Sequence, residues 1–479
     1  MTETLLTSAR VGDRLVDLRV VDGVIRGIAA SIAAPDAQVI DLDGRWVVPG
    51  LWDEHVHFGQ WALYASRLDL SGATSAAGAA ALVRARLARG DAPHPLVGVG
   101  FRDGLWADEP TRQLLDAVTG AHPVVLLSGD LHCVWLNSAA LEMHGRGEHP
   151  TGLLREDDAF AIEQAVDALE PAELDRLVGD AARVAASRGV VGIVDLEMTW
   201  ALDTWRRRVA AGFDALRVEF GVYRGNLDRA IELGLRTGEP LDALLTVGRF
   251  KILIDGSLNT RTAYCDDAFP GGGHGMLVVP PEELVPLLHQ ATDAGIEASV
   301  HAIGDHAVAL ALDAFAAVGT ARAGLGGRIE HAQLVRTADL PRFAELGVAA
   351  SVQPEHAMDD RDVADRYWAG RGSRVIPVRS LLDAGARVLF GSDAPVAPLD
   401  PWVTMAAAVT RARDGRAPWH PEQTVTPDEA LAASARTSIA VGRPADLVAV
   451  DADPRDGSAL RTMPVAATWL AGRPTFSAL

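Results

Sequence analysis

The chain has 479 residues and a formal net charge of −20 at pH 7, with 64 acidic against 44 basic residues. Nucleic acids and anionic membranes attract basic surfaces, so this balance excludes both as expected partners and leaves a small-molecule substrate. With 48% hydrophobic residues the chain can bury a large core. Its length allows two or three ordinary domains, or one large barrel with an accessory domain.

Cysteine usage and the first residues predict a cytoplasmic protein. The two cysteines, Cys133 and Cys265, are too few and too far apart for a disulfide framework or a cysteine zinc site. The amino terminus lacks the basic region and apolar stretch of a signal peptide. No run approaches the ~20 apolar residues of a membrane span, so we expect no membrane association.

The two ends of the chain have the pattern of short strands. Residues 16–21 and 24–28 are largely apolar and flank Asp22-Gly23, a strong signal for a β-hairpin. Residues 446–451 and 467–473 have the same strand pattern. These similar ends predict a small discontinuous β-domain that both termini form together.

The middle of the chain alternates apolar strand candidates with alanine-rich helical stretches such as 281–294 and 306–318. The candidate strands are residues 190–197, 248–255, 296–302, 328–333, 348–353 and 388–393. This alternation predicts parallel strands joined by crossover helices, in a barrel or in an open doubly wound sheet. Residues 60–160 fit it less well, and we interpret them as an insertion that covers one end of the core.

Residues that bind metals or transfer protons lie at the carboxyl ends of these strands, where a (β/α)8 barrel has its active site. Asp53, His55 and His57 alternate along a predicted strand, so their side chains share one face, and two imidazoles so placed can bind one metal ion. His301, His331 and Asp393 follow at later strand ends. Each alone is more often a core histidine or a helix cap. Their repetition at successive strand ends indicates a site.

Lys251 is the one lysine among the 44 lysines and arginines. It lies in an apolar, strand-like run, residues 249–255, rather than in a charged segment. A lysine can lose its proton when it is desolvated, whereas an arginine cannot. Chance survival in an arginine-biased chain is the alternative explanation, but the position between histidine-bearing strands favours a function.

Taken in order, these residues resemble the metal-binding set of the amidohydrolase superfamily of metal-dependent hydrolases. The set comprises Pro49-Gly50, Asp53-x-His55-x-His57, Lys251, His301, His331 and Asp393. Flanking segments resemble the branch that contains N-substituted formamide deformylase, amidohydrolase family 3. These segments are residues 101–106, 131–141, 251–257 and 351–354, and the resemblance covers essentially the whole chain.

The resemblance implies an α/β fold in three parts. These are a (β/α)8 TIM-like barrel at residues 50–430, an insertion at about 60–160 that caps the barrel mouth, and a β-sandwich built from residues 1–49 and 431–479. The chain departs from the family pattern at residues 432–441, where the connection between barrel and sandwich is shorter than usual. This difference concerns local packing and the contact of a possible homodimer, and it affects no metal position.

The resemblance also implies a site for two divalent metal ions, with zinc as the expected metal. His55, His57 and Asp393 would hold the first ion, and His301 and His331 the second. Lys251, carboxylated by carbon dioxide, would bridge the two ions as a carbamate, which arginine cannot form. Asp393 would also be the catalytic base, taking a proton from the attacking water and returning it to the leaving nitrogen. A purely structural ligand is its alternative role.

The predicted enzyme is an amidohydrolase that cleaves a non-peptide carbon–nitrogen bond, amide or formamide, with a metal-activated hydroxide at a binuclear site. A mononuclear deaminase or a cyclic-amide hydrolase of the imidazolone type is the alternative on the same fold. Such enzymes generally do not need the bridging lysine, so Lys251 counts against them. A non-catalytic binding protein that has kept the barrel is the alternative of another class, and the complete ligand set counts against it.

Four residues are weaker candidates for binding the substrate or supporting the site. His132 lies in the insertion, and the resemblance suggests that it reaches over the barrel mouth; a surface histidine is the alternative. Trp106 would line a hydrophobic pocket or simply pack in a core. Asp255 lies four residues beyond Lys251 on the same strand face and would orient a ligand or cap a helix. Gln353 falls in one of the segments that resemble the family.

Overall fold

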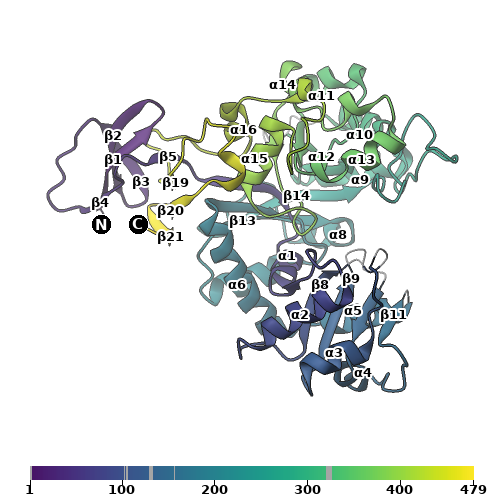
Figure 1. Cartoon of the computed structure of the whole chain (residues 1–479). Helices are drawn as coiled ribbons and strands as arrows, with labels where there is room; N and C mark the ends of the chain where they lie inside the picture. The colour runs from purple at the N-terminus through teal and green to yellow at the C-terminus, as the bar shows by residue number, and fades with distance from the viewer. Residues whose placement is uncertain (1–2, 102, 104–105, 129–132, 156, 320–325) are drawn as a thin grey trace. The chain divides into compact units, whose positions relative to one another are not determined.

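The computed structural model describes residues 3–101, 103, 106–128, 133–155, 157–319 and 326–479. The chain divides into two compact units (Figure 1). The larger comprises Met1–Phe58 and Ala182–Leu479, and the smaller comprises Gly59–Ala181. Each unit contains its own sheet and its own buried apolar cluster.

The larger unit contains an eight-stranded sheet whose neighbouring strands all run parallel. In order, the strands are β6 (Leu51–Val56), β12 (Val190–Asp195), β13 (Arg217–Tyr223), β14 (Leu245–Leu253), β15 (Ala298–Ala302), β16 (Arg328–His331), β17 (Ala349–Val352) and β18 (Val388–Phe390). A parallel bridge between Val56 and Ala394 joins the last strand to the first. The sheet therefore closes into a barrel, which confirms this prediction and excludes the open doubly wound sheet.

Helices follow the barrel strands. They are α7 (Ala201–Ala210), α8 (Leu227–Glu232), α9 (Pro281–Asp293), α10 (Asp305–Val318), α11 (Leu340–Leu346), α12 (His356–Asp359), α13 (Arg361–Tyr367), α14 (Val378–Asp383), α15 (Pro401–Thr410) and α16 (Pro427–Ala433). The last two, α15 and α16, lie in the chain between the barrel and β19 (Leu447–Val450). Proline at the first position and two glutamates in the first turn favour the start of α9, and a capping box between Thr426 and Glu429 starts α16. Within the described part of the chain, no helix is long and apolar enough to cross a membrane.

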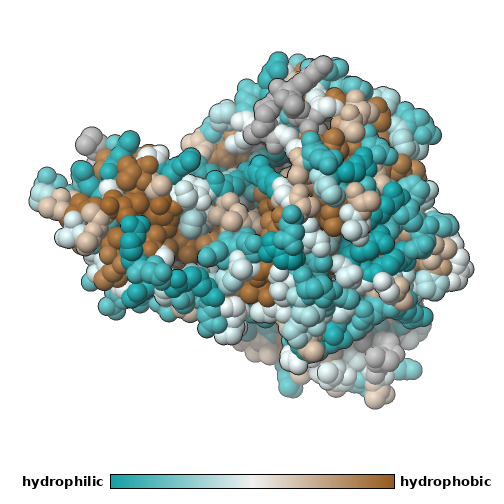
Figure 2. Space-filling model, turned by 90° about the horizontal axis from the view of Figure 1, so that it is seen from above, coloured by the Kyte–Doolittle hydropathy of each residue, from teal (hydrophilic) through white to brown (hydrophobic). Residues whose placement is uncertain are grey.

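Both termini contribute strands to one β-domain within the larger unit. The strands are β1 (Glu3–Val11), β2 (Arg14–Val21), β3 (Val24–Ala29), β4 (Gln38–Asp41), β5 (Trp46–Pro49), β19 (Leu447–Val450), β20 (Val465–Leu470) and β21 (Arg473–Ser477). β19 pairs antiparallel with β5, which joins the two ends of the chain. Asp22 and Gly23 both have positive φ, as the predicted hairpin between β2 and β3 requires. Figure 2 shows apolar residues gathered on one face of this β-sandwich domain.

The smaller unit has a five-stranded sheet of its own, in the order β11-β10-β9-β8-β7. Its strands are β7 (Leu68–Asp69), β8 (Leu96–Phe101), β9 (Val124–Ser128), β10 (Cys133–Leu136) and β11 (Leu153–Arg155). Its helices are α1 (Phe58–Ala65), α2 (Ala76–Leu87), α3 (Arg112–Thr119), α4 (Ser138–Met143) and α5 (Asp157–Asp167). Helix α6 (Pro171–Ser187) begins in this unit and ends in the larger one, which resumes at Ala182. Side chains from α2, α3 and the sheet form the core of the smaller unit, so this segment is a folded unit and not only a long loop.

Candidate metal centre

The barrel brings the predicted ligands to the carboxyl ends of its strands. His55 lies in β6, Lys251 in β14, His301 in β15 and His331 in β16. His57 follows β6 directly, and Asp393 comes three residues after β18. Since neighbouring strands are parallel, their carboxyl ends meet at one rim of the barrel, which is the usual place of an active site on this fold.

Asp393 lies between the two histidines of the His-x-His segment. Its Oδ1 is 3.3 Å from His55 Nε2 and 3.4 Å from His57 Nε2. Among the described residues, one group of potential metal ligands has its atoms within 4.8 Å of one another, and it consists of His55, His331 and Asp393. Imidazole nitrogens and carboxylate oxygens are the donors that zinc accepts. The residues therefore fit a divalent metal ion.

His301 and His331 lie next to each other, with ring centroids 4.5 Å apart. Burial lowers the pKa of His301 to about 3 and that of His331 well below its ordinary value. Both rings are therefore neutral at pH 7. Neutral imidazole is the form that binds a metal, because one ring nitrogen then keeps its lone pair.

Lys251 is almost completely buried, with 2% of its surface exposed. Its Nζ has no hydrogen-bond partner among the described residues. Burial lowers the pKa of this ammonium from 10.5 to about 8, so the free amine is far more abundant near neutral pH than it is in an exposed lysine. A buried nitrogen without a partner, which releases its proton easily, fits a lysine that is carboxylated.

Backbone geometry at two strand ends aims side chains into the site. His331 has φ of 72° and Asp393 has φ of 58°, in the left-handed region that side chains with a Cβ rarely adopt. Such conformations persist only where the surroundings impose them. At Asp393 the imposing contact is a hydrogen bond of 2.7 Å from its N–H to the His55 carbonyl, which ties β6 to the segment after β18.

Asp53 has a structural position beside the site. Its Oδ1 accepts hydrogen bonds from the N–H groups of His55, at 3.1 Å, and Ser392, at 3.0 Å. Ser392 directly precedes Asp393, so one carboxylate oxygen ties together the two segments that carry His55 and Asp393. Burial raises the pKa of Asp53 to about 6. The alternation along β6 correctly predicted that Asp53 is buried, and its contacts are to backbone N–H groups.

The weaker candidates have different surroundings. Asp255 accepts hydrogen bonds from the N–H groups of Tyr264 and Gly304, at 2.9 and 2.8 Å, and its Oδ1 lies 3.5 Å from His301 Nε2. It thus holds the loop after β15 beside a predicted ligand. Gln353 is buried directly after β17, and its Nε2 has no partner within the described ranges.

Two weaker candidates belong to the smaller unit. Trp106 is half-buried in that unit, where its ring centroid lies 5.7 Å from that of Phe101. Packing accounts for this contact, and a role in substrate binding stays a prediction. His132 lies outside the residues that the structure describes.

Glu330 is a site residue that sequence reasoning missed. It is fully buried in β16, and its Oε2 lies 2.7 Å from His55 Nδ1. The signal was present, because Arg328 and Glu330 are two charges at alternate positions of an apolar strand. Charges buried in a strand are rarely left without a partner.

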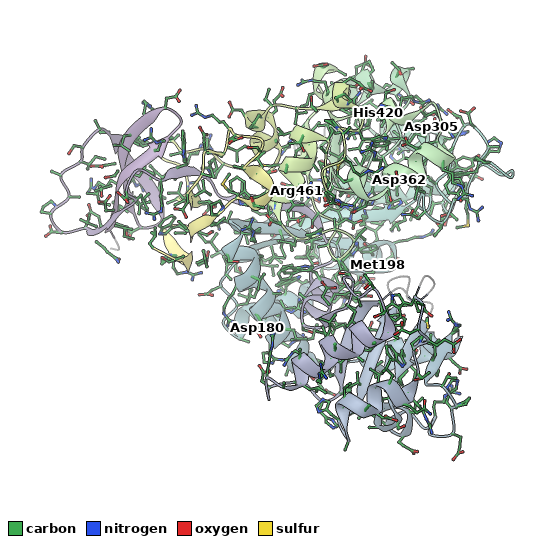
Figure 3. All side chains as sticks on the ribbon, in the orientation of Figure 1. Asp180, Met198, Asp305, Asp362, His420 and Arg461 are labelled. Carbon is green, nitrogen blue, oxygen red and sulfur yellow. The ribbon has the colours of Figure 1, made fainter. Side chains whose placement is uncertain are left out.

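His356 lies beside two of the predicted ligands. Its Nε2 is 3.8 Å from Asp393 Oδ2, and its ring stacks on that of His331 at 6.2 Å. Glu355 fixes its helix, α12, through ion pairs of 2.8 Å with Arg413 and 2.9 Å with Arg461, the latter labelled in Figure 3. Helix α12 follows β17 by a short turn, which places His356 at the same rim of the barrel.

Comparison with known proteins agrees with this geometry. A family model described as "Amidohydrolase family" matches residues 38–476. The N-substituted formamide deformylase of Arthrobacter pascens is 30% identical over 92% of this chain and 90% of its own length. The putative amidohydrolase YtcJ of Bacillus subtilis is 27% identical over 85% of this chain and 82% of its own.

A solved structure shares the fold over most of its length. The uncharacterized metal-dependent hydrolase of Pyrococcus horikoshii OT3 superposes with a TM-score of 0.78 at 25% identity, over 95% of this chain and 98% of the other. The family model spans the barrel and part of the β-domain, from β4 to β21 but without β1, β2 and β3, and the ligand residues lie within its match. The resemblance drawn from the sequence is thus confirmed: this chain belongs to the amidohydrolase family of metal-dependent hydrolases.

Proposed function

We propose that this enzyme hydrolyses a non-peptide carbon–nitrogen bond, of the amide or formamide type, at a site that holds two divalent metal ions, zinc in the first place. The observation that carries the proposal is the buried Nζ of Lys251, which has no hydrogen-bond partner among the described residues and lies at the same rim as four histidines and Asp393. A mononuclear site has no need of this lysine, whereas a carbamate on it supplies two oxygens that can bridge a metal pair.

In this proposal each ion has its own protein ligands. His55, His57 and Asp393 hold one ion, in keeping with the 3.3 and 3.4 Å separations between Asp393 Oδ1 and the two imidazoles. His301 and His331, both neutral, hold the other. Lys251, carboxylated by carbon dioxide, would be a ligand of both ions.

Bound divalent ions lower the pKa of water and polarise a substrate carbonyl. The chain's own residues then handle the protons. Burial alone would raise the pKa of Asp393, but His55 and His57 hold it well below its ordinary value, so the carboxylate is ionised at pH 7. An ionised Asp393 can accept the proton of the attacking water and return it to the departing nitrogen.

The likeness to the formamide deformylase of Arthrobacter pascens supports formamides as the first substrates to test. The experiment combines metal analysis of the purified protein with a hydrolysis screen of N-substituted formamides, amides, cyclic amides, esters and lactones. Two ions per chain with formamide or amide turnover is the expected result. One ion per chain would favour the mononuclear alternative, and two ions without any turnover would favour a binding protein.

A further inference from the structure

We propose that Glu330 is a positioning residue of the metal centre, which holds the imidazole of His55 with Nδ1 protonated and Nε2 free for the metal. The inference rests on the proposed function, because it assigns the partner of one predicted ligand. It concerns the residue behind the ligand, and it names a residue that the sequence alone did not single out.

The geometry places the hydrogen between Glu330 and His55 on the imidazole. Glu330 Oε2 lies 2.7 Å from His55 Nδ1, and both side chains are buried, with 0% and 1% exposed. A carboxylate accepts hydrogen bonds and donates none, so the hydrogen in this contact belongs to Nδ1. The opposite ring nitrogen, Nε2, points toward Asp393 Oδ1 at 3.3 Å, the side on which the ion would bind. A carboxylate behind a histidine fixes its tautomer and orientation and increases its basicity as a ligand.

Glu330 is itself held on its other oxygen. Ser299 Oγ donates a hydrogen bond of 2.5 Å to Oε1, and Arg328 Nε lies 2.7 Å from the same oxygen. Ser299 comes from β15 and Arg328 from β16, so two barrel strands hold the carboxylate in place. A side chain with this many fixed contacts can define the position of its neighbour.

The charge of Glu330 is balanced without Lys251. Arg328 lies between Glu330 and Glu54, whose Oε2 is 3.1 Å from Arg328 Nη1. Arg436 and Arg249 neutralise the next carboxylate of this cluster, Glu219, at 2.7 and 2.9 Å. Lys251 Nζ has no hydrogen bond to any of these carboxylates in the described structure. Glu330 therefore accepts a hydrogen bond from His55 and none from Lys251, whose Nζ stays available to form the proposed carbamate.

Among the described residues, two other predicted ligands lack a hydrogen bond of the kind that Glu330 accepts from His55. The Nδ1 atoms of His57 and His331 are buried without a partner in the part of the chain that the structure describes. His55 differs from them, because its Nδ1 has the carboxylate of Glu330 at hydrogen-bonding distance. Loss of Glu330 should therefore lower the affinity for the ion that His55 would bind.

The test compares metal affinity in E330Q, E330A and the control E219Q. Glu219 belongs to the same buried arginine cluster but contacts no predicted ligand in the described structure, so E219Q reproduces the general cost of removing a buried charge. Zinc affinity is measured by competition with a chromophoric chelator at pH 7, together with the melting temperature of each metal-free protein. We expect E330Q and E330A to bind at least one ion about 10- to 100-fold more weakly than wild type, with E219Q within about threefold of wild type.

Unchanged affinity in E330Q and E330A would overturn the positioning role, and so would an equal loss in E219Q. Hydrolysis by the wild type is assayed separately. A wild type that binds zinc but hydrolyses nothing would contradict the proposed function while the affinity comparison still decides the role of Glu330. A wild type that takes up no metal would overturn both.

Discussion

Lys251 is the residue on which the proposed chemistry most depends, and its surroundings explain why an arginine could not replace it. The nearby carboxylate Glu330 is already paired with Arg328, Ser299 and His55. An ammonium without a partner among the described residues and with 2% exposure is costly, which lowers its pKa to about 8, so a fraction of the side chains is the free amine at neutral pH and can react with carbon dioxide. Arginine stays protonated and would bury an unpaired charge at the same place.

We expect Lys251→Arg to lose bound metal and to lower turnover by at least about 100-fold, since a direct ligand matters more than the partner of a ligand. Lys251→Met should also lose metal, but its metal-free form should unfold with the same free energy as wild type or a higher one, because it removes a buried charge without a partner. Metal analysis and thermal unfolding check both variants. Near-normal activity in Lys251→Arg would refute the carbamate.

Asp393 gives a second prediction at this scale. Asp393→Asn keeps an oxygen toward the metal but removes the base, so we expect kcat to fall by about 10² to 10⁴-fold. Metal content is measured in the same samples, because a fall in kcat explained by lost metal would not bear on proton transfer. Full metal content with more than a tenth of wild-type kcat would leave Asp393 as a ligand only.

At the scale of elements, the junction of β6 with the segment after β18 both closes the barrel and builds the site. The His57 N–H donates to the Ala394 carbonyl at 2.9 Å, and the Asp393 N–H donates to the His55 carbonyl at 2.7 Å. Gly391 allows this close approach, because a Cβ there would lie 2.6 Å from the His55 nitrogen. The same two hydrogen bonds therefore close the barrel and position the predicted ligands.

Gly391→Ala should separate the two segments. A Cβ placed against backbone cannot be accommodated by a rotamer change, so we expect a loss of about 1–3 kcal/mol in the free energy of unfolding, together with loss of metal. Gly179→Ala in α6 is the matched control: a Cβ there meets nothing within 4 Å, and alanine should stabilise the helix by about 0.5–1 kcal/mol. Equal behaviour of the two variants in thermal unfolding would contradict this reading of the junction.

The observed strands show how much of the fold the sequence predicts. The six strands expected from apolar runs all form, and the run at 248–255 corresponds to β14 with Lys251 inside it. β13 was not predicted, because Glu219 and Gly221 interrupt its apolar pattern, and only the arginine cluster explains a buried glutamate there. The sheet of residues 59–181 was also missed, since periodicity could not distinguish strands in a segment rich in glycine and proline. Glu330 was missed because its role depends on contacts between distant strands, which spacing along the chain does not reveal.

At the scale of the whole larger unit, the barrel and the β-sandwich are joined by the short connection at residues 432–441. Arg436, in this connection, stacks on Trp52 at 3.8 Å from the ring centroid. It also pairs with Glu54 at 2.6 Å and Glu219 at 2.7 Å. This connection thus delivers the cation that neutralises two barrel carboxylates, one of them adjacent to His55.

Arg436→Ala would leave Glu54 and Glu219 buried with too little positive charge around them. Removing one partner of a buried ion pair costs about 3–5 kcal/mol, and we expect the lower end because the Arg436 side chain is 27% exposed. Arg455→Ala is the matched control: Arg455 also stacks on a tryptophan and pairs with two aspartates, but at the surface, where such pairs contribute about 0–1 kcal/mol.

The pH dependence of this difference tests its cause. Burial alone would raise the pKa of Glu219, but Arg436 and Arg249 lower it to about 2, and Arg436 and Arg328 also lower the pKa of Glu54. A carboxylate with a lowered pKa stabilises the fold fully above its unfolded pKa, about 4.3, and loses that contribution as the pH falls toward its folded pKa. In Arg436→Ala both carboxylates should protonate at a higher pH than in wild type. As a result, the difference in free energy of unfolding between wild type and the variant should shrink as the pH falls. Urea unfolding should therefore give a larger difference at pH 7 than at pH 4, and a difference independent of pH would mean that Arg436 acts through packing on Trp52 instead of through charge.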